Sequence, residues 1–539
     1  MRRAYRERAA ASQRAGRSPV GWLGRGICPG HAFGSARLWH FAAFDLEAGA
    51  ARPAAAKRQD LATTLTPDLF VIGAGASGLA AAFAARRLGA SVVVAEKGEP
   101  GGISPRTGAL ALSALAAAAE KAAATVSGEP FGVLGEPAKV SLRKVHDHVA
   151  AVMRENAADD GPARLAAAGI ELVRGHARFT DPHTVHVGEE TQVRARRFII
   201  ATGASPVIPN LPGLFSVPWF TAETIFDNTR KLTHLVVIGA GPMGLELALC
   251  YRRLGAEVTV LEPGAALSHL DPELAEIALR RLRDEGVALR ENVVVVAIHA
   301  RSQGIGIDIR SGETASTLDA SHILVAAGRS ANLGDLELDA AKIRRAKSDV
   351  AALALTPSLR TTNPKVYAIG EAAGHAPAAH LAAIEAELVV RAALLGEPRR
   401  YDPASVPRLT LTDPPIAEIG LSEPIARARL KTGFTVLRAS YAQSDAARAA
   451  RGGMGVVKLI VGRDGRVLGA GIVGEGAADL IGLFSLAITA RLPAARLADL
   501  AAPYPSHAEL VRRLGEQAAA AAPVSVWDQR RFALMRILP

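Results

Sequence analysis

Two glycine-rich turns, each followed by a glutamate, are the residues of this chain best suited to hold a cofactor. Each copy has three glycines and one glutamate: Gly73, Gly75, Gly78 and Glu96 in the first, and Gly239, Gly241, Gly244 and Glu262 in the second. In such a turn the first glycine permits a sharp bend from strand to helix, and the third permits close packing of the helix on the strand. The second lets a pyrophosphate approach the N–H groups at the helix start. The glutamate, 23 residues past the first glycine, can accept hydrogen bonds from ribose hydroxyls. The pattern therefore predicts two dinucleotide sites.

An internal repeat with an offset of 166 residues positions these turns. Residues 71–75 (VIGAG) recur at 237–241, and the RRLGA sequence at 86–90 recurs at 252–256. Each copy is typical of an apolar strand, a turn, an Ala- and Leu-rich helix, and a second strand that ends in the glutamate. Two such βαβ units predict an α/β protein with two Rossmann-like domains. We expect Arg252 and Arg253, on the second helix, to form a solvated face.

The composition is that of a globular protein and excludes several classes. The chain has 539 residues, enough for three or four domains, with 49% hydrophobic, 21% charged and 4% aromatic residues. Of the net charge of +11, residues 1–65 carry +7, so the rest of the chain is nearly balanced. We therefore expect a basic, disordered leader at 1–65, with a transit-like segment or an upstream start-codon artefact as the alternatives, and no nucleic-acid partner. No run of about eighteen apolar residues predicts a membrane span.

The chain has two cysteines, Cys28 and Cys250, and neither has a partner nearby in the sequence. This predicts no disulfide framework and no cysteine-based metal site, and we expect no metal cofactor. A reducing cytoplasm is the simplest compartment.

Four more motifs complete a specific set: residues 97–102 (KGEPGG), 201–206 (ATGASP), 327–329 (AGR) and 362–371 (TNPKVYAIGE). With the two glycine-rich turns, they resemble the pyridine nucleotide-disulfide oxidoreductases, the family of dihydrolipoamide dehydrogenase, glutathione reductase and mercuric reductase. The resemblance runs from about residue 68 to about residue 517. It implies an FAD-binding domain at 66–207 and 332–398, an NAD(P)-binding domain at 208–331, a C-terminal α+β dimerisation domain at 403–517, and a tail at 518–539.

The C-terminal part carries its own match. Residues 412–423 (TDPPIAEIGLSE) resemble a motif of the family's dimerisation domain. The apolar runs 456–461 and 467–473 flank a Gly-Arg-Asp-Gly turn and predict an antiparallel strand pair. A homodimer follows from the resemblance.

The resemblance also implies which cofactor each site binds. The first repeat would bind FAD, with further contacts from Lys97, Thr202, Gly203, Gly370, Glu371 and His380. Glu371 stands where the family has an aspartate that reaches a ribityl hydroxyl, and it is one methylene longer. His380 begins a helix whose N-terminus would face the flavin, and we leave open whether it acts there or only packs. The second repeat, with Gly328, would bind the nicotinamide cofactor, and Glu262 favours NADH over NADPH because a 2′-phosphate would be repelled.

The family's redox centre is missing. Its two cysteines align with Ser104 and Ala109, and a family lysine aligns with Ser113. Glu246 matches the acid that pairs with that lysine, and so it has lost that partner. Neither serine nor alanine forms a disulfide or a thiolate near pH 7.

A second departure lies near the C-terminus, where the partner subunit's catalytic His and Glu occur in the family. Tyr504 stands at the His position and Glu509 at the Glu position. This version is similar to mercuric reductase-like members, and without a thiol a catalytic His has no task. We treat Tyr504, Glu509 and Glu246 as candidate catalytic residues. His507 is expected to be a surface histidine.

Three functions are compatible with this pattern. The first is an FAD-dependent enzyme that passes hydride from NADH to flavin and then to a quinone, oxygen or another nicotinamide. The second is a catalytically silent flavin-binding homologue with a structural or regulatory role, although the intact second repeat argues against such decay. The third is dihydrolipoamide dehydrogenase or mercuric reductase activity. It is disfavoured because both activities need the thiol pair, and residues 524–539 add no cysteine.

Overall fold

The structure is a computed structural model that describes residues 63–102, 107–157, 161–375, 378–521 and 526–537. Most of the expected leader lies outside the described residues. Residues 63–65, which we had assigned to it, instead form strand β1 (Thr63–Leu65), which pairs in parallel with β7 (Thr191–Val193). The leader boundary at 65 is therefore wrong, because the backbone of this segment is paired within a sheet.

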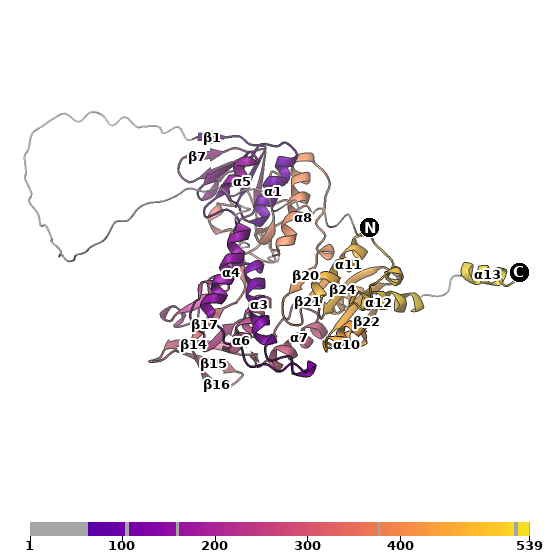
Figure 1. The fold of residues 1–539 in the computed structure, drawn as a ribbon. Coiled ribbons are helices and arrows are strands. Elements are labelled where there is room, and N and C mark those ends of the chain that lie inside the picture. Colours follow the sequence, from indigo (N-terminus) through magenta and orange to yellow (C-terminus); the bar gives the residue numbers. More distant parts are fainter. Residues whose placement is uncertain (1–62, 103–106, 158–160, 376–377, 522–525, 538–539) are drawn as a thin grey trace, which may run out of the picture. The chain divides into compact units, whose positions relative to one another are not determined.

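The first repeat forms a parallel five-stranded sheet of order β19-β8-β2-β3-β4. Its strands are β2 (Leu69–Ile72), β3 (Val92–Glu96), β4 (Ile170–Arg174), β8 (Arg197–Ile200) and β19 (Val366–Ala368). Helices α1 (Ala76–Arg87), α5 (Pro162–Ala167) and α8 (Ala379–Val390) accompany it, and α1 and α8 lie side by side (Figure 1). The side chains of β2 are fully buried, as expected for a central strand covered on both faces. A smaller sheet adds β5 (Ala177–Asp181) and β6 (Thr184–Val187) beside β7 and β1.

The second repeat forms a second parallel sheet of order β10-β17-β11-β12-β13. Its strands are β10 (Trp219–Thr221), β11 (His234–Ile238), β12 (Glu257–Glu262), β13 (Ala288–Glu291) and β17 (His322–Val325). Its helices are α6 (Pro242–Arg253) and α7 (Pro272–Asp284), and an antiparallel sheet is built from β14 (Val294–Ala300), β15 (Ile305–Ser311) and β16 (Thr314–Ala320). The predicted second strand of each repeat is confirmed, and each strand ends in its glutamate.

Two short strands mark where the chain crosses between these sheets. Strand β9 (Ala204–Pro206) and strand β18 (Arg329–Ala331) pair in antiparallel fashion, so the outgoing and returning connections are bonded to each other. Two more helices, α3 (Ala109–Ala124) and α4 (Leu142–Ala157), belong to the long segment between β3 and β4. Buried residues of α3, including Leu112 and Leu115, share one hydrophobic core with α6.

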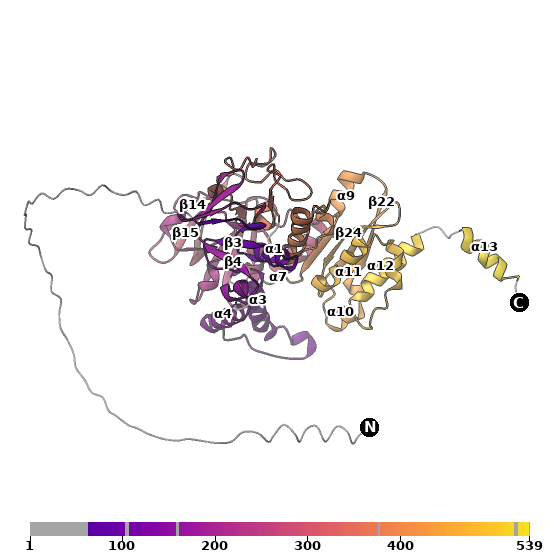
Figure 2. The ribbon, with the colours of Figure 1, turned by 90° about the horizontal axis from the view of Figure 1, so that it is seen from above.

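The C-terminal part is an antiparallel sheet of order β20-β21-β24-β23-β22. Its strands are β20 (Arg408–Thr410), β21 (Ile416–Gly420), β22 (Phe434–Ser440), β23 (Val456–Gly462) and β24 (Val467–Val473), and the predicted β23–β24 pair is confirmed. Helices α11 (Ala477–Thr489) and α12 (Ala508–Ala521) pack on this sheet (Figure 2). The other helices are α9 (Glu423–Leu430), α10 (Asp445–Ala449) and, in the expected tail, α13 (Val526–Met535).

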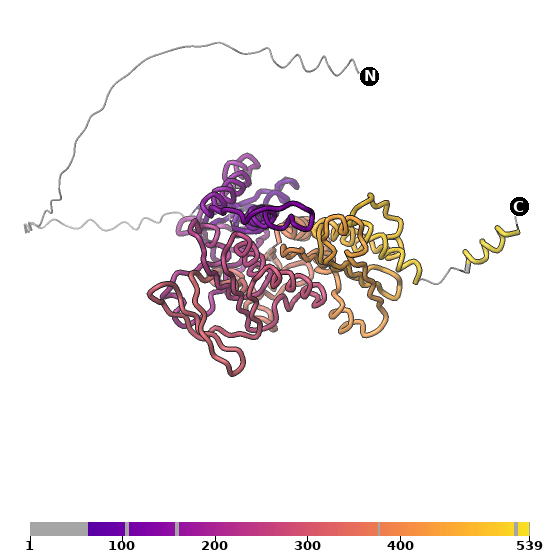
Figure 3. The backbone as a smooth tube through the Cα atoms, turned by 60° about the horizontal axis from the view of Figure 1, so that its bottom comes forward, coloured from indigo at the N-terminus to yellow at the C-terminus, as the bar shows by residue number. Residues whose placement is uncertain are grey.

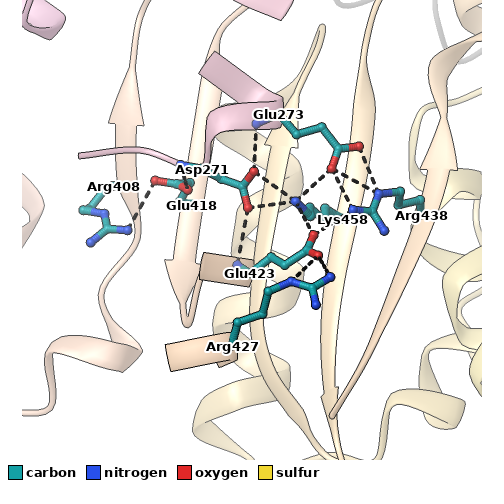
Figure 4. A network of polar contacts seen from close by, with 8 residues as sticks. All are labelled: Asp271, Glu273, Arg408, Glu418, Glu423, Arg427, Arg438 and Lys458. Carbon is teal, nitrogen blue, oxygen red and sulfur yellow. Dashed lines mark hydrogen bonds and ion pairs between the residues drawn. The ribbon is translucent and has the colours of Figure 1, made fainter. Parts of the chain in front are cut away.

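Several contacts attach this C-terminal sheet to the rest, and two of them involve the segment after α3 and the start of α7. The segment after α3 runs toward it (Figure 3), and the Arg451 guanidinium lies 6.0 Å from the Phe131 ring centroid. The start of α7 is joined to it by a buried polar network centred on Lys458 of β23 (Figure 4). The Lys458 ammonium contacts both carboxylate oxygens of Asp271 at 2.9 Å, Glu273 at 2.8 Å and Glu423 at 2.7 Å. Among the described helices, none is long and apolar enough to cross a membrane.

Candidate active site

The two glycine-rich turns have nearly the same geometry. Gly73 and Gly239 have φ angles of +106° and +110°, and a Cβ at either position would clash with the carbonyl oxygen of the neighbouring strand end. A Cβ at the third glycine of each turn, Gly78 or Gly244, would clash with the carbonyl oxygen of the first. These positions therefore require glycine on steric grounds alone.

The second glycine of each turn is different, because it borders space instead of protein. Apart from its chain neighbours, no heavy atom of the described residues lies within 4 Å of a Cβ built on Gly241, and at Gly75 the Cα of Gly102 is the one such atom, at 3.9 Å. Both residues are N-caps of their helices and provide no side-chain cap. The first N–H groups of α1 and α6 therefore keep their donors available at the point where a pyrophosphate would lie.

The two strand-end glutamates are held in the same way. The Glu96 carboxylate accepts hydrogen bonds from the N–H groups of Ala74 and Gly98, both at 2.7 Å. The Glu262 carboxylate accepts from Ala240 at 2.7 Å and Gly264 at 3.1 Å. Each oxygen has a second lone pair, so these bonds orient the carboxylate and still allow it to accept from a ribose hydroxyl.

The remaining residues expected at the FAD site follow the carboxyl ends of β3, β8 and β19, at one edge of the sheet. This edge is where open α/β sheets bind ligands. Lys97 is exposed, and Gly203 and Gly370 have positive φ angles. The Thr202 hydroxyl is buried, and its oxygen has no hydrogen-bond partner within the described part of the chain. A buried polar atom without a partner is costly, so this orphaned hydroxyl fits a site that a polar cofactor completes.

Glu371 is bound to an arginine that sequence reasoning did not assign to the site. The Arg329 guanidinium donates to Glu371 at 2.6 Å and to Glu223 at 2.6 Å. Gly328, expected at the nicotinamide site, directly precedes this arginine and has a φ of +106° with open space around it. The arginine belongs to the AGR motif at 327–329, of which the sequence analysis assigns only Gly328 to a site.

A second pair beside the same loop was also missed. The fully buried Glu385 accepts the Gly370 N–H at 2.6 Å and contacts the His375 ring at 2.6 Å. The His375 ring stacks on Tyr401 with the ring centroids 4.4 Å apart. His380, in contrast, is exposed, and its Nε2 lies 2.9 Å from the carbonyl oxygen of Pro407. Glu385 pairs with residues that lie 10 and 15 positions earlier, and because these separations match no helix or strand period, no sequence pattern predicts the pairing.

Of the two positions aligned with the family's redox cysteines, one begins α3. Ser104 falls outside the described residues, whereas Ala109 is exposed as the first residue of α3 and Ser113 is exposed one turn further on. Cys250 is buried on α6, and burial raises the pKa of its thiol to about 12. The one described cysteine is therefore a protonated core residue and no substitute for a redox thiolate.

Glu246 lies one helical turn before Cys250 and is also buried. Its carboxylate accepts a hydrogen bond from the Leu411 N–H, so the acid that lost its lysine partner has a backbone partner instead. Burial nevertheless raises the pKa of Glu246 to about 7. This carboxyl therefore holds or releases a proton near neutral pH.

Tyr504 and Glu509 lie in the C-terminal domain. Tyr504 is exposed and donates a hydrogen bond to Asp445 at 3.2 Å, and this bond raises the pKa of its phenol. Within the described residues, no hydrogen bond or ion pair joins Tyr504 or Glu509 to the cofactor-binding residues of the same chain.

Two expectations about surface residues are wrong. The Arg253 side chain is only 10% exposed, because Glu285 and Asp413 bind it, and Arg252 donates to backbone carbonyl groups. The His507 side chain is 17% exposed and lies between Tyr441 and Glu475. A local sequence pattern predicts that these side chains face solvent. In the fold, residues from distant parts of the sequence contact them instead.

Comparison with known proteins decides the family. Residues 67–386 match the family model described as "Pyridine nucleotide-disulphide oxidoreductase", and residues 406–514 match the model of its dimerisation domain. The chain belongs to this family. It is therefore an FAD-dependent pyridine nucleotide oxidoreductase, and the predicted fold of two dinucleotide-binding domains and a C-terminal dimerisation domain is confirmed.

Relatives and solved structures agree with this assignment. The chain is 32% identical to a mercuric reductase of Streptomyces lividans over 462 residues, covering 83% of this chain and 94% of the relative. It is 30% identical to a dihydrolipoyl dehydrogenase of Geobacillus stearothermophilus over 465 residues, covering 84% and 96%. In fold it is similar to the HOCl-induced flavoprotein disulfide reductase RclA from Escherichia coli in its Cu(II) complex, with a TM-score of 0.72, 23% identity, and coverage of 84% of this chain and 99% of that chain.

Proposed function

We propose that this enzyme oxidises NADH with its FAD and passes the electrons to an acceptor other than a protein disulfide. The observation that carries the proposal is the start of α3, where Ala109 occupies a cysteine position of the family. The chain has only Cys28 and Cys250, and Cys250 is a buried, protonated core residue. A quinone, oxygen or a second nicotinamide would then accept the electrons directly.

The residues present fit FAD in the first domain. Gly73, Gly75 and Gly78 would hold its pyrophosphate at the start of α1, Glu96 its ribose, and the orphaned Thr202 hydroxyl would gain a partner. When bound, the flavin supplies the hydride chemistry between nicotinamide and acceptor. The protein's task is to hold the two dinucleotides in reacting geometry and to exclude water.

The second domain would hold NADH in preference to NADPH. The Glu262 carboxylate, oriented by Ala240 and Gly264, is a good acceptor for the ribose hydroxyls and would repel a 2′-phosphate. Glu246, with its pKa of about 7, is the titratable group on α6 that could exchange a proton with the site near neutral pH. Tyr504 and Glu509 would act from the partner subunit of a homodimer.

Anaerobic titration with NADH tests the proposal. We expect full flavin reduction with one two-electron equivalent per FAD and no thiolate–flavin charge-transfer band. Steady-state assays with a panel of quinones should then show NADH oxidation. A fully loaded flavoprotein that NADH does not reduce would instead support a silent homologue, and lipoamide-dependent NADH turnover would contradict the disulfide-free route.

A further inference from the structure

Arg329 lies where the chain returns from the NAD domain to the FAD domain, and its guanidinium makes three hydrogen bonds. Nε donates to Oε1 of Glu371, Nη1 donates to Oε1 of Glu223, and Nη2 donates to the carbonyl oxygen of Ala204, each at 2.6 Å. The side chains of Arg329, Glu223 and Glu371 are 24%, 27% and 18% exposed. Charge-assisted bonds of this kind are short and fix the planar guanidinium in one orientation. Arg329 is therefore rigidly held and weakly screened by solvent.

The three acceptors come from three different segments. Glu371 follows β19 at the carboxyl edge of the FAD sheet, Glu223 follows β10 in the NAD domain, and Ala204 begins the outgoing connection β9. Strand β18, which starts with Arg329, pairs with β9. Arg329 thus ties both crossing connections to the loop that carries the flavin-binding acid. Although burial alone would lower the pKa of Arg329, its bonds to Glu223 and Glu371 raise that pKa.

The bond to Arg329 occupies one oxygen of Glu371, and among the described residues the other oxygen accepts no hydrogen bond. Oε1 accepts from Arg329, whereas Oε2 lies 3.9 Å from the position that a Cβ on Gly203 would take. Gly203 directly follows Thr202, whose buried hydroxyl has no partner in the described part of the chain. The free carboxylate oxygen therefore lies beside the Thr202–Gly203 turn, where the FAD site has its orphaned polar atom.

We infer that Arg329 is a positioning residue for the flavin, which holds one oxygen of Glu371 so that the other faces the Thr202–Gly203 turn. This inference rests on the proposed FAD site. The guanidinium also compensates the charge of Glu371 and Glu223. Without it, the Glu371 carboxylate at the proposed flavin site is uncompensated, and negative charge there opposes the uptake of electrons.

The test compares R329Q, E371Q and the double variant by FAD dissociation constant and by flavin midpoint potential. We expect R329Q to bind FAD about tenfold more weakly. If a variant weakens the binding of reduced flavin tenfold more than that of oxidised flavin, the two-electron midpoint potential falls by about 30 mV. We expect R329Q to lower the potential by this amount. The double variant should have the potential of E371Q alone, because Arg329 acts through Glu371.

Two further variants sharpen the test. R329K keeps the charge but not the planar fork, so it should weaken FAD binding and keep the wild-type potential. It also replaces R329Q if that variant does not fold. R196Q removes an exposed arginine that pairs with Asp68 in the same domain and should leave both quantities unchanged.

The outcomes separate this inference from the proposed function. If the wild-type protein binds no FAD, both fail. If it binds FAD and R329Q has the wild-type dissociation constant and potential, the positioning role alone is overturned. The inference would also be overturned if R329Q lowered the midpoint potential of the wild type and of E371Q by the same amount. Arg329 would then act independently of Glu371.

Discussion

At the scale of single residues, the three glycines of each turn have separable roles. Gly239 is required by its backbone conformation and by the nearby Ala326 carbonyl group, whereas Gly241 borders open space. G239A should therefore lower the thermal stability of the protein, since alanine at positive φ and a clash each cost at least about 1 kcal/mol. G241A should fold normally and weaken NADH binding, because the added methyl group occupies the space of the pyrophosphate.

Thermal unfolding and NADH titration of both variants check this prediction. Each variant serves as the control for the other, because both add one methyl group to the same turn. If G241A binds NADH as tightly as the wild type does, the open space beside Gly241 has no role in binding.

Glu246 makes stability depend on pH. Its pKa is raised from 4.5 to about 7 by burial, so the folded protein holds this proton more tightly than the unfolded chain does. The cost of ionisation is absent below about pH 4.5, grows as the pH rises through 7, and is constant above. E246Q should therefore stabilise the protein at pH 8 by on the order of 3 kcal/mol, since the pKa rises from 4.5 to about 7 and each pKa unit is worth about 1.4 kcal/mol, and it should have little effect at pH 5.

Melting temperatures of wild type and E246Q between pH 5 and pH 8 measure this difference. E257Q, which changes an exposed glutamate at the start of β12, is the matched control and should be neutral throughout. A stabilisation by E246Q that does not change with pH would show that the carboxyl does not titrate in this range.

At the scale of elements, the Lys458 network fixes α7 of the NAD domain on the C-terminal sheet (Figure 4). Asp271 is 2% exposed and accepts from Lys458 and from the N–H groups of Glu273 and Glu423. Burial alone would lower the pKa of Lys458, but its bonds to the three carboxylates raise it. The lysine is therefore the charged centre that lets these carboxylates be buried together.

K458M should be strongly destabilising. It leaves the buried Asp271 carboxylate without its cation, and breaking a buried ion pair costs about 3–5 kcal/mol. Urea unfolding should show a lower midpoint than in wild type, whereas K347M, at an exposed loop lysine, should not change it. If K458M unfolds at the wild-type midpoint, the network does not hold α7 in place.

The elements themselves were largely predictable, and their mutual contacts were not. Glycine spacing and strand-end glutamates determine a βαβ unit locally, so both Rossmann sheets and the β23–β24 hairpin could be predicted. Arg253 shows what could not be predicted. The helix pattern alone places its side chain toward solvent, but in the fold it binds Asp413, which lies 160 residues away in the sequence. The Arg329 and Lys458 clusters likewise join residues that only the tertiary fold brings together. The βαβ units that would hold the cofactors could thus be predicted from the sequence, but not the side chains that orient the residues of the proposed sites.

At the scale of the whole molecule, the C-terminal domain offers an apolar surface for a second copy. The exposed residues of α11 are Ala478, Asp479, Gly482, Leu486 and Thr489, so the face is apolar except near its two ends, and Leu486 is 65% exposed. An apolar helix face on a domain of the dimerisation family is expected to be covered by a partner. Tyr504 and Glu509, in the same domain, could then reach the flavin of the other subunit.

L486R should therefore convert a dimer into a monomer, because a buried arginine without a partner is not tolerated in an apolar interface. Light scattering after size exclusion measures the mass, and absorbance measures bound FAD. We expect the L486R monomer to retain its FAD, since that site lies within one chain, and to lose most of its NADH:quinone turnover, since the partner's Tyr504 and Glu509 are removed. V350R, which adds the same charge at an exposed site outside this domain, should remain dimeric and active. A fully active L486R monomer would show that one chain contains the complete catalytic site.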